Sequence, residues 1–264
     1  MKARGYIPDV HDGRDCRYGA LRGAVTPARA SVLPHVKHVL DQGQLGSCVW
    51  NAIAQAIEIC LDTQGKPMKE PISRLFGYYN ARAADGDPLE DGGCQPRSAW
   101  KVATNLGLPP EHVWPYDVSQ FTLQPPYGAY KAAADHRWLK GYYRLTGTGS
   151  AKIGDLKAAI GNGHGPVCLG IPVDTAFENY HGGVYTAKGP SLGGHYLCAV
   201  GYDDSGLWIV NSWGEGWGVA PKKLDASAFP LLGGGCAVLD WNFVRDNATD
   251  LWAANVAPPM GNAA

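Results

Sequence analysis

A long helix is predicted to begin at Cys48, directly after a glycine-rich turn. Beyond Cys48, apolar residues recur at intervals of three and four, which is the spacing of one buried helical face. These positions are Val49, Ile53, Ile57, Cys60 and Leu61. Gly65 and Pro67 then end the pattern, so the helix is expected to stop before Gly65.

Two further helices follow in the pattern. Ser73 is a good N-terminal cap for a helix over residues 73–82, whose apolar residues lie on one face. A third helix is predicted near residues 95–105, with Trp100 and Val102 in the core. This part of the chain is therefore predicted to be helical.

From about Tyr142 the pattern changes to short strands. The continuous apolar run over residues 166–173 predicts a buried strand, after a brief helix over residues 153–161. Two more apolar runs, over residues 193–202 and 207–211, predict neighbouring strands. The second part of the chain is therefore expected to be rich in β-structure.

Length and charge narrow the function classes. A chain of 264 residues can bury a large core and fits one large domain or two lobes. Its net charge of −1 gives no electrostatic reason to expect nucleic acid or an acidic membrane as a partner. No apolar run approaches the roughly 18–20 residues that span a bilayer, and the basic start lacks the apolar core of a secretory signal.

Cys48 is the candidate nucleophile. At the first turn of a helix, unpaired N–H groups and the helix dipole favour negative charge, so a thiol there is biased toward the thiolate. His195 follows a glycine pair in an apolar run, Asn211 ends the next run, and Gln42 lies six residues before Cys48 across the turn. Taken singly, each has an ordinary alternative: a buried cysteine, a core histidine, a turn asparagine and a solvated glutamine.

Three motifs occur in order: Gln-Gly-x-x-Gly-Ser-Cys ending at Cys48, Gly-His-x-x-x-Ala-Val-Gly-Tyr around His195, and Asn-Ser-Trp-Gly-x-Gly-Trp-Gly from Asn211. They resemble those of the papain family of cysteine peptidases, of which Cys with distant His and Asn is a known signature. The resemblance implies an α+β fold with a helical left lobe, a β-barrel-like right lobe and an active-site cleft between them. It divides the chain into an N-terminal arm (1–35), a helical lobe (36–140), a β-rich lobe (141–245) and a C-terminal tail (246–264), which is expected to be disordered from Ala257.

The resemblance also implies catalytic roles. Cys48 attacks the substrate carbonyl as a thiolate, and His195 pairs with it and delivers a proton to the departing amine. Asn211 orients the imidazole ring, and Trp213 shields the bond between them from water. Gln42 and the Cys48 backbone N–H stabilise the oxyanion.

Substrate-binding positions follow from the same resemblance. Gly92 and Gly93 match the glycine pair whose backbone pairs with an extended peptide, although a bare turn is an equal alternative. Gly170 and Tyr196 match positions that border the main specificity pocket. Trp217, like Trp213, is expected beside the substrate, on the leaving-group side.

The N-terminal arm resembles the opening of bacterial members of the family, Gly-x-x-Pro-Asp-x-x-Asp-x-Arg-Asp. An arm packed on the body is one interpretation. The other is that residues near Cys16 lie across the cleft and restrain the enzyme until displaced.

Secreted relatives carry a disulfide-bonded cysteine three residues before the nucleophile, where this chain has Leu45. With seven cysteines and no regular spacing, a reducing compartment is expected, bacterial cytoplasm or a phage-infected cell.

The predicted function is hydrolysis of peptide bonds through a thioester, as an endopeptidase. Acyl transfer with the same triad, or a non-catalytic peptide-binding module on the same fold, are the alternatives. No cofactor and no metal site are expected, because the remaining histidines show no Cys/His pairing at zinc-ligand spacing. The expected partner is a protein or peptide substrate, with no nucleic acid or membrane, and a monomer is expected.

Overall fold

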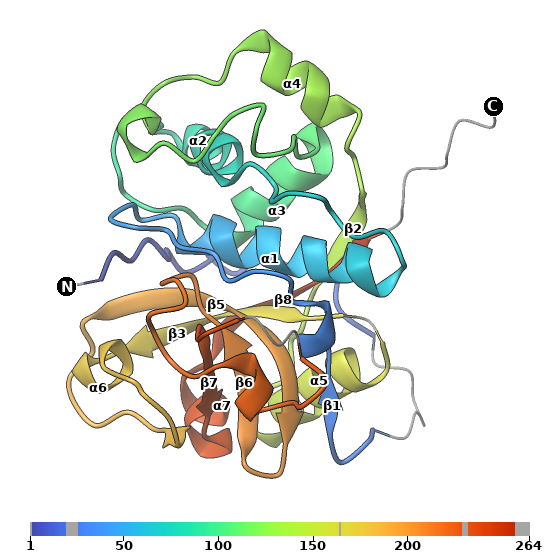
Figure 1. Cartoon of the computed structure of the whole chain (residues 1–264), viewed down its shortest axis with the longest axis vertical. Coiled ribbons are helices and arrows are strands. Elements are labelled where there is room, and N and C mark those ends of the chain that lie inside the picture. Colours follow the sequence, from blue (N-terminus) through green and yellow to red (C-terminus); the bar gives the residue numbers. More distant parts are fainter. Residues whose placement is uncertain (1, 20–25, 164, 229–231, 257–264) are drawn as a thin grey trace.

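The computed structural model describes residues 2–19, 26–163, 165–228 and 232–256. Residues 20–25 of the predicted arm, and the tail from residue 257 that was expected to be disordered, lie outside the described residues. Helix α1 crosses the centre of the molecule, with helices α2, α3 and α4 on one side and the sheet on the other (Figure 1). The change from helices to strands along the sequence is therefore also a separation in space.

The described chain contains seven α-helices, three short 3-10 helices and eight strands. The α-helices are α1 (Cys48–Thr63), α2 (Arg74–Asp85), α3 (Pro96–Leu106), α4 (Tyr127–Ala134), α5 (Ser150–Gly161), α6 (Thr175–Glu178) and α7 (Trp241–Asn247). The 3-10 helices are η1 (Leu33–His35), η2 (Val118–Gln120) and η3 (Pro221–Lys223). The strands are β1 (Ala30–Ser31), β2 (Leu139–Arg144), β3 (Val167–Val173), β4 (Val184–Tyr185), β5 (Gly193–Asp203), β6 (Gly206–Val210), β7 (Cys236–Leu239) and β8 (Thr249–Val256).

The three predicted helices of the first half are confirmed. Helix α1 begins at Cys48 and ends before Gly65. Helix α2 has Ser73 as its N-terminal cap, whose side chain accepts a hydrogen bond from the Phe76 backbone N–H. In α3, Trp100 is fully buried, as expected from its apolar face.

The sheet is open and does not close into a barrel. Among the described residues its strand order is β2-β8-β3-β5-β6-β7-β4, with β1 added beside β5. The neighbours pair antiparallel except β4 and β7, which run parallel. The expected β-barrel-like lobe is thus an open sheet, whose strand order begins at β2 and ends at β4.

Strand β8 corrects the predicted C-terminal tail. Its residues, Thr249–Val256, lie between β2 and β3 and pair with both. The side chains of Leu251 and Trp252 are buried in the core. The segment after residue 246 therefore belongs to the sheet, because burying these large side chains removes apolar surface from water.

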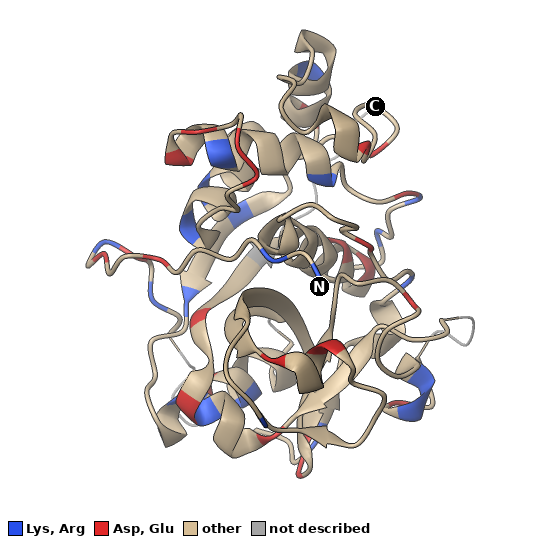
Figure 2. Cartoon of the chain, turned by 90° about the vertical axis from the view of Figure 1, so that its left-hand side faces the viewer, with Lys and Arg blue, Asp and Glu red and all other residues tan. Residues whose placement is uncertain are grey.

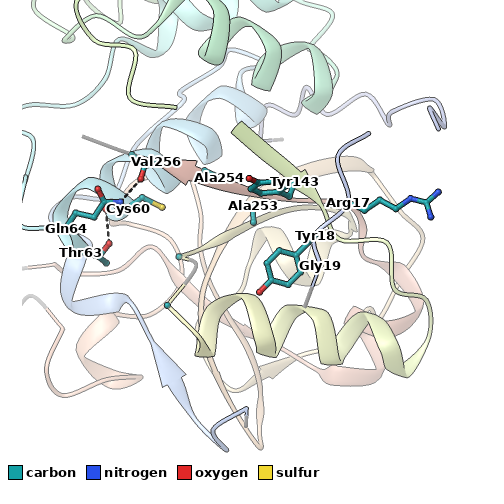
Figure 3. A pocket seen from close by; sticks show the side chains of 12 residues that line it. Arg17, Tyr18, Gly19, Cys60, Thr63, Gln64, Tyr143, Ala253, Ala254 and Val256 are labelled. Carbon is teal, nitrogen blue, oxygen red and sulfur yellow. Dashed lines mark hydrogen bonds between the residues drawn. The ribbon is translucent and has the colours of Figure 1, made fainter. Parts of the chain in front are cut away.

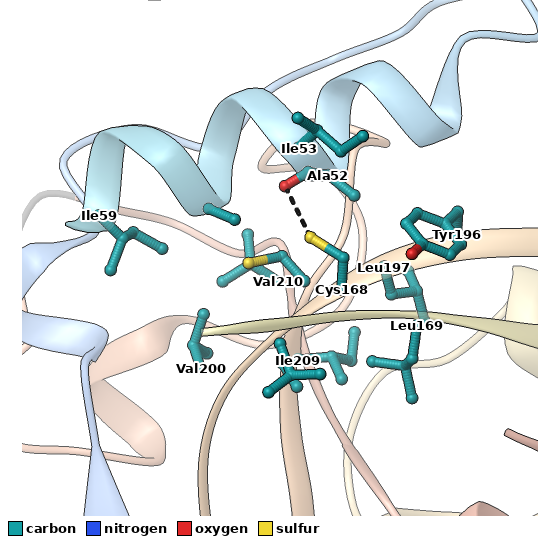
Figure 4. Close-up of a cluster of buried hydrophobic side chains, with 14 of the residues drawn as sticks. Ala52, Ile53, Ile59, Cys168, Leu169, Tyr196, Leu197, Val200, Ile209 and Val210 are labelled. Carbon is teal, nitrogen blue, oxygen red and sulfur yellow. Dashed lines mark hydrogen bonds between the residues drawn. The ribbon is translucent and has the colours of Figure 1, made fainter. Parts of the chain in front are cut away.

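The face of the sheet is packed against α1. In a cluster of buried apolar side chains, Cys168 of β3 points toward Ala52 of α1, whereas Leu169, the next residue of the strand, points to the other face of the sheet (Figure 4). The Cys168 thiol donates a hydrogen bond to the Ala52 carbonyl oxygen at 3.4 Å. This packing holds the first turn of α1, and with it Cys48, over the strand that carries His195.

Candidate active site

Cys48 is the first residue of α1 and its side chain is fully buried. The backbone N–H of Gly5, from the N-terminal segment, donates a hydrogen bond to the Cys48 Sγ at 3.4 Å. Burial raises the pKa of the Cys48 thiol to about 11, although this bond and neighbouring N–H groups act in the opposite direction. The thiolate expected from the helix terminus is therefore not the favoured form in this arrangement, because the loss of water outweighs the N–H groups.

His195 and Asn211 form a hydrogen-bonded pair. His195 lies on β5 and Asn211 directly after β6, two strands that pair antiparallel. The His195 Nε2–H donates to the Asn211 Oδ1 at 2.7 Å. The other ring nitrogen, Nδ1, is buried and has no hydrogen-bond partner among the described residues. It is therefore the ring atom left to exchange a proton.

The charge state of His195 is set by its surroundings. Burial lowers the pKa of the ring to about 4, and the positive charge of Arg4 acts in the same direction, against the bond to Asn211. Trp213 stacks on the ring, with centroids 4.5 Å apart and an interplanar angle of 26°. Since Trp213 is itself buried, it covers one face of the histidine ring.

Gln42 is held by its own hydrogen bonds. Its side-chain oxygen accepts from the Ser212 hydroxyl at 2.6 Å, which fixes the amide orientation. The amide nitrogen, Nε2, then donates to the Leu45 carbonyl at 2.9 Å and to the Ala3 carbonyl at 3.1 Å. An amide N–H of Gln42 thus already binds a carbonyl oxygen, which is the task expected of an oxyanion donor.

The N-terminal segment lies between the helices and the sheet, as seen from the side of the N-terminus (Figure 2). Its backbone pairs with Cys94: the Cys94 N–H donates to the Gly5 carbonyl at 3.0 Å, and the Ile7 N–H donates to the Cys94 carbonyl at 3.3 Å. Gly93 permits this approach, because a Cβ built on it would lie 2.2 Å from the Gly5 oxygen. Gly92 is exposed, and the pairing of Gly92 and Gly93 with a substrate peptide stays a prediction.

The segment is not in position for cleavage. A peptide group that is attacked presents its carbonyl carbon to the nucleophile while the same carbonyl's oxygen binds the oxyanion donors. Here the carbonyl at Gln42 belongs to Ala3, whereas an N–H of Gly5, from the next peptide group, faces the Cys48 sulfur. Residues 3–5 therefore lie against Cys48 and Gln42 without presenting one and the same carbonyl group to both.

On one side of Cys48 the segment is held by charge. The Arg4 guanidinium lies 2.6 Å from the Glu178 carboxylate, at the end of α6, and both side chains are largely buried. The Lys2 backbone N–H donates to the same carboxylate at 3.1 Å. The Lys2 ammonium lies 5.9 Å from the Trp213 ring centroid. Trp217 is buried beside Trp213, with its indole N–H bonded to the Phe177 carbonyl.

On the other side, Tyr6 occupies a side-chain pocket. Its ring lies 5.4 Å from that of Tyr196, and a Cβ built on Gly170 would lie 2.3 Å from it. The Tyr6 hydroxyl donates to the Asp250 carboxylate at 2.6 Å and lies 2.7 Å from the Thr249 hydroxyl. Gly170 and Tyr196 thus border the pocket that holds Tyr6; that this pocket receives a substrate side chain stays a prediction. Asp250 was missed, because it falls in the segment interpreted as a tail.

Residues near Cys16 do not cross the cleft, which corrects that hypothesis. The Arg144 N–H donates to the Cys16 carbonyl at 2.8 Å, and the Tyr18 N–H donates to the Arg144 carbonyl at 2.8 Å, so this part of the arm extends the sheet beside β2. The Asp15 carboxylate binds the guanidinium groups of Arg97 and Arg144, at 2.7 and 3.0 Å. These ion pairs hold the arm at the sheet edge and leave the cleft to residues 3–6.

A separate cavity of about 370 Å³ lies at the opposite end of α1 (Figure 3). It is bordered by Cys60, Gln64, Tyr143 and Val256, and the Gln64 amide donates to the Val256 carbonyl at 2.7 Å. None of the predicted catalytic residues borders it.

Among the described residues, no three His, Cys, Asp or Glu side chains are grouped so as to hold a metal ion, and no helix is long and apolar enough to cross a membrane. All seven cysteines are free thiols.

Comparison with known proteins identifies the family. Residues 27–220 match the profile of the family described as papain family cysteine protease. The chain belongs to the papain family. The α+β fold and the resemblance stated from the sequence motifs are thereby confirmed.

Individual members of the papain family are similar over most of this chain. An uncharacterized peptidase C1-like protein of Acanthamoeba polyphaga mimivirus is 35% identical over 71% of the chain, and papain of Carica papaya is 28% identical over 80%. The chain spans 63% of the length of the viral protein and 53% of that of papain. The crystal structure of xylellain, a cysteine protease from Xylella fastidiosa, is 28% identical, with a TM-score of 0.81 over 97% of both chains.

Proposed function

We propose that this papain-family chain is an endopeptidase that hydrolyses peptide bonds through a thioester on Cys48. The observation that carries the proposal is that three groups meet the same short stretch of the arm: the Cys48 thiol at the Gly5 N–H, the Gln42 amide at the Ala3 carbonyl, and the His195–Asn211 pair (2.7 Å), where the charge of Arg4 lowers the pKa of the ring. Amide hydrolysis needs these parts: a nucleophile, an oriented acid–base group and a donor for the oxyanion.

The steps follow from these positions. With the thiol proton on His195, the Cys48 sulfur attacks the substrate carbonyl carbon, and the oxygen takes up negative charge against the Gln42 amide N–H and the Cys48 backbone N–H. The carbon–nitrogen bond then breaks, His195 gives its proton to the departing amine, and a thioester remains. Water, deprotonated by His195, attacks the thioester and releases the acid and the thiol. Asn211 keeps the ring oriented, and the stacked Trp213 excludes water from their bond.

Endopeptidase action is supported by the path of the arm. The arm places Lys2 beside Glu178 on one side of Cys48 and Tyr6 beside Asp250 on the other. The groove therefore accommodates polypeptide on both sides of the nucleophile. An exopeptidase needs a feature that closes one side, and an arm running through the groove argues against such a barrier.

The arm is also proposed to keep the enzyme latent. It fills the cleft without offering a carbonyl carbon to Cys48. It further removes water from the reacting pair, and the resulting pKa values of about 11 for Cys48 and about 4 for His195 favour a neutral thiol beside a neutral ring. A neutral thiol is a poor nucleophile, so displacement of the arm restores both access and reactivity.

The test uses the full chain with Tyr6→Ala, which empties the pocket that holds the arm. It should hydrolyse internal bonds of an unstructured protein such as casein, and a thiol-directed epoxide should modify Cys48 and abolish hydrolysis. Cys48→Ala in the same chain should be inactive, whereas Cys16→Ala, which removes an exposed thiol, should retain full activity. A folded chain whose Cys48 is not modified would indicate a peptide-binding module. Peptidyl-amide products with an added amine would indicate acyl transfer.

A further inference from the structure

We infer that Asp250 makes the pocket occupied by Tyr6 selective for tyrosine in the substrate. This inference rests on the proposed function and assigns a specificity-determining residue to it. The arm shows what the pocket accepts, because both ends of the Tyr6 side chain are bound there. The Tyr6 ring packs on the Tyr196 ring, and the Tyr6 hydroxyl donates a hydrogen bond to the Asp250 carboxylate.

The shape of the pocket fits a flat ring. Its walls come from neighbouring strands, since Gly170 of β3 is opposite Tyr196 of β5 and also opposite Thr249 of β8. A Cβ built on Gly170 or on Gly194 would lie 2.3 or 2.8 Å from the Tyr6 ring. Two glycines thus leave the width of an aromatic ring, and the Tyr196 ring provides the apolar surface on which it packs.

At the bottom of the pocket, the Asp250 carboxylate accepts hydrogen bonds from a fixed position. Asp250 is 6% exposed and has a φ of 47°, a left-handed conformation that residues other than glycine seldom adopt. Its carboxylate binds the Arg144 guanidinium, and its backbone carbonyl accepts from the Tyr196 hydroxyl at 2.8 Å. These bonds hold the carboxylate in place, with one oxygen, Oδ2, facing the Tyr6 hydroxyl and the Asp9 N–H.

Tyrosine, which has a hydroxyl group, is therefore favoured over phenylalanine in this pocket. When the arm leaves, the bonds from Tyr6 and Asp9 to Asp250 Oδ2 are lost together. A substrate tyrosine restores a hydrogen bond to this carboxylate, and phenylalanine does not. A hydrogen bond to a charged group corresponds to a preference of about tenfold to hundredfold. Water limits the preference to this range, because Asp250 also borders a cavity of about 610 Å³.

Tyrosine, a neutral hydrogen-bond donor, is also favoured over the positively charged side chains of lysine and arginine. Asp9 donates to Asp250 from the segment that leaves with Tyr6, whereas Arg144 remains bound to Asp250. Asp15 stays at the sheet edge, paired with Arg97 and Arg144. The Asp250 carboxylate of the open pocket thus already has a guanidinium partner. Lysine or arginine would place a second positive charge beside Arg144, so the neutral phenol of tyrosine fits better.

The experiment compares peptides within one enzyme. The full chain with Tyr6→Ala is assayed with acetylated tetrapeptidyl aminomethylcoumarins in which Tyr, Phe, O-methyltyrosine or Arg occupies each position in turn. At one position, kcat/KM for Tyr should exceed that for each of the others by about tenfold or more. O-methyltyrosine keeps the ring and oxygen but cannot donate. Adding Asp250→Asn, which retains a residue type tolerant of the left-handed conformation, should reduce the Tyr to Phe ratio to about threefold or less. Asp246→Asn, the same change at an exposed side chain, should leave the ratio unchanged.

Binding separates this inference from the proposed function. The same tetrapeptides, as amides, are titrated calorimetrically into the full chain with Tyr6→Ala and Cys48→Ala. Tighter binding of the Tyr peptide by tenfold or more, without hydrolysis by the Tyr6→Ala chain, would refute the proposed function and leave the pocket assignment standing. Hydrolysis with equal kcat/KM for Tyr and Phe, a ratio unaffected by Asp250→Asn, or equal affinities for the two peptides would overturn the assignment.

Discussion

Replacing Tyr6 by alanine should release the arm from the cleft. The substitution removes the hydroxyl bond to the Asp250 carboxylate and the packing of the ring on Tyr196 and Gly170. A hydrogen bond to a charged group contributes about 1.5–3 kcal/mol. Truncating a fully buried aromatic side chain costs about 3–5 kcal/mol, and Tyr6 is only partly buried. The two effects overlap, so a loss of about 3–5 kcal/mol in docking free energy is expected.

The loss can be measured as the reactivity of Cys48. If iodoacetamide reaches the thiol only when the arm is away, its rate is proportional to the open fraction. A loss of about 3–5 kcal/mol then raises the rate about 10²- to 4 × 10³-fold, up to the rate of the fully open chain. Alkylation at pH 7 is followed by mass spectrometry of the peptide that contains Cys48, because Cys16 is exposed and reacts independently.

Two variants make the measurement specific. Tyr6→Phe retains the ring and should raise the rate by about tenfold to hundredfold. Tyr127→Ala removes a tyrosine that is 83% exposed on α4, so the rate at Cys48 should stay at the wild-type value. If Tyr6→Ala alkylated no faster than Tyr127→Ala, the arm would not be held by this pocket, and the reasoning would be refuted.

Three other outcomes are expected. Arg4→Glu should speed alkylation of Cys48 by about tenfold or more, since it faces Glu178 with a like charge, and adding Glu178→Arg should reverse most of the effect; an unchanged rate would contradict the ion pair. In the full chain the alkylation rate of Cys48 should rise up to about pH 11 without a plateau. Docking of the arm raises the pKa of the Cys48 thiol, so the docked state keeps a proton that the open state loses. Docking is therefore strongest below the ordinary thiol pKa and weakens above it. A plateau near pH 7 would show a thiolate under the docked arm. In the Tyr6→Ala chain, Gln42→Ala should lower kcat about 100- to 1,000-fold while alkylation of Cys48 is retained; an unaffected kcat would exclude Gln42 as an oxyanion donor.

The elements with a strong periodic pattern were predictable from the sequence. Helix α1 is buried from Cys48 to Leu61, so its apolar spacing identifies it clearly. Strand β3 is buried along nearly its whole length, so it is recognised in the sequence as a continuous apolar run. His195 and Asn211 meet because Asn211 directly follows β6, the strand that pairs with β5, which carries His195. The order of the motifs indicates this meeting, whereas the apolar pattern alone does not.

The arm and the pocket bottom were not predictable in the same way. Strand β8 follows a helix of only seven residues and carries polar residues at its start, so it lacks a clean alternation. The contact of Tyr6 with Asp250 joins residues 244 positions apart, and no local pattern reports such a distance. The thiol's charge state depends on its complete burial, which outweighs the helix terminus that the sequence indicates.

The covalent intermediate tests the central claim most directly. The full chain with Tyr6→Ala is mixed with a peptide p-nitrophenyl ester, quenched in acid within milliseconds and digested for mass spectrometry. The peptide containing Cys48 should carry the acyl group at up to one equivalent, and Cys48→Ala should carry none. Release of p-nitrophenol by the enzyme with no acyl group on Cys48, or with the acyl group on another cysteine, would contradict the account.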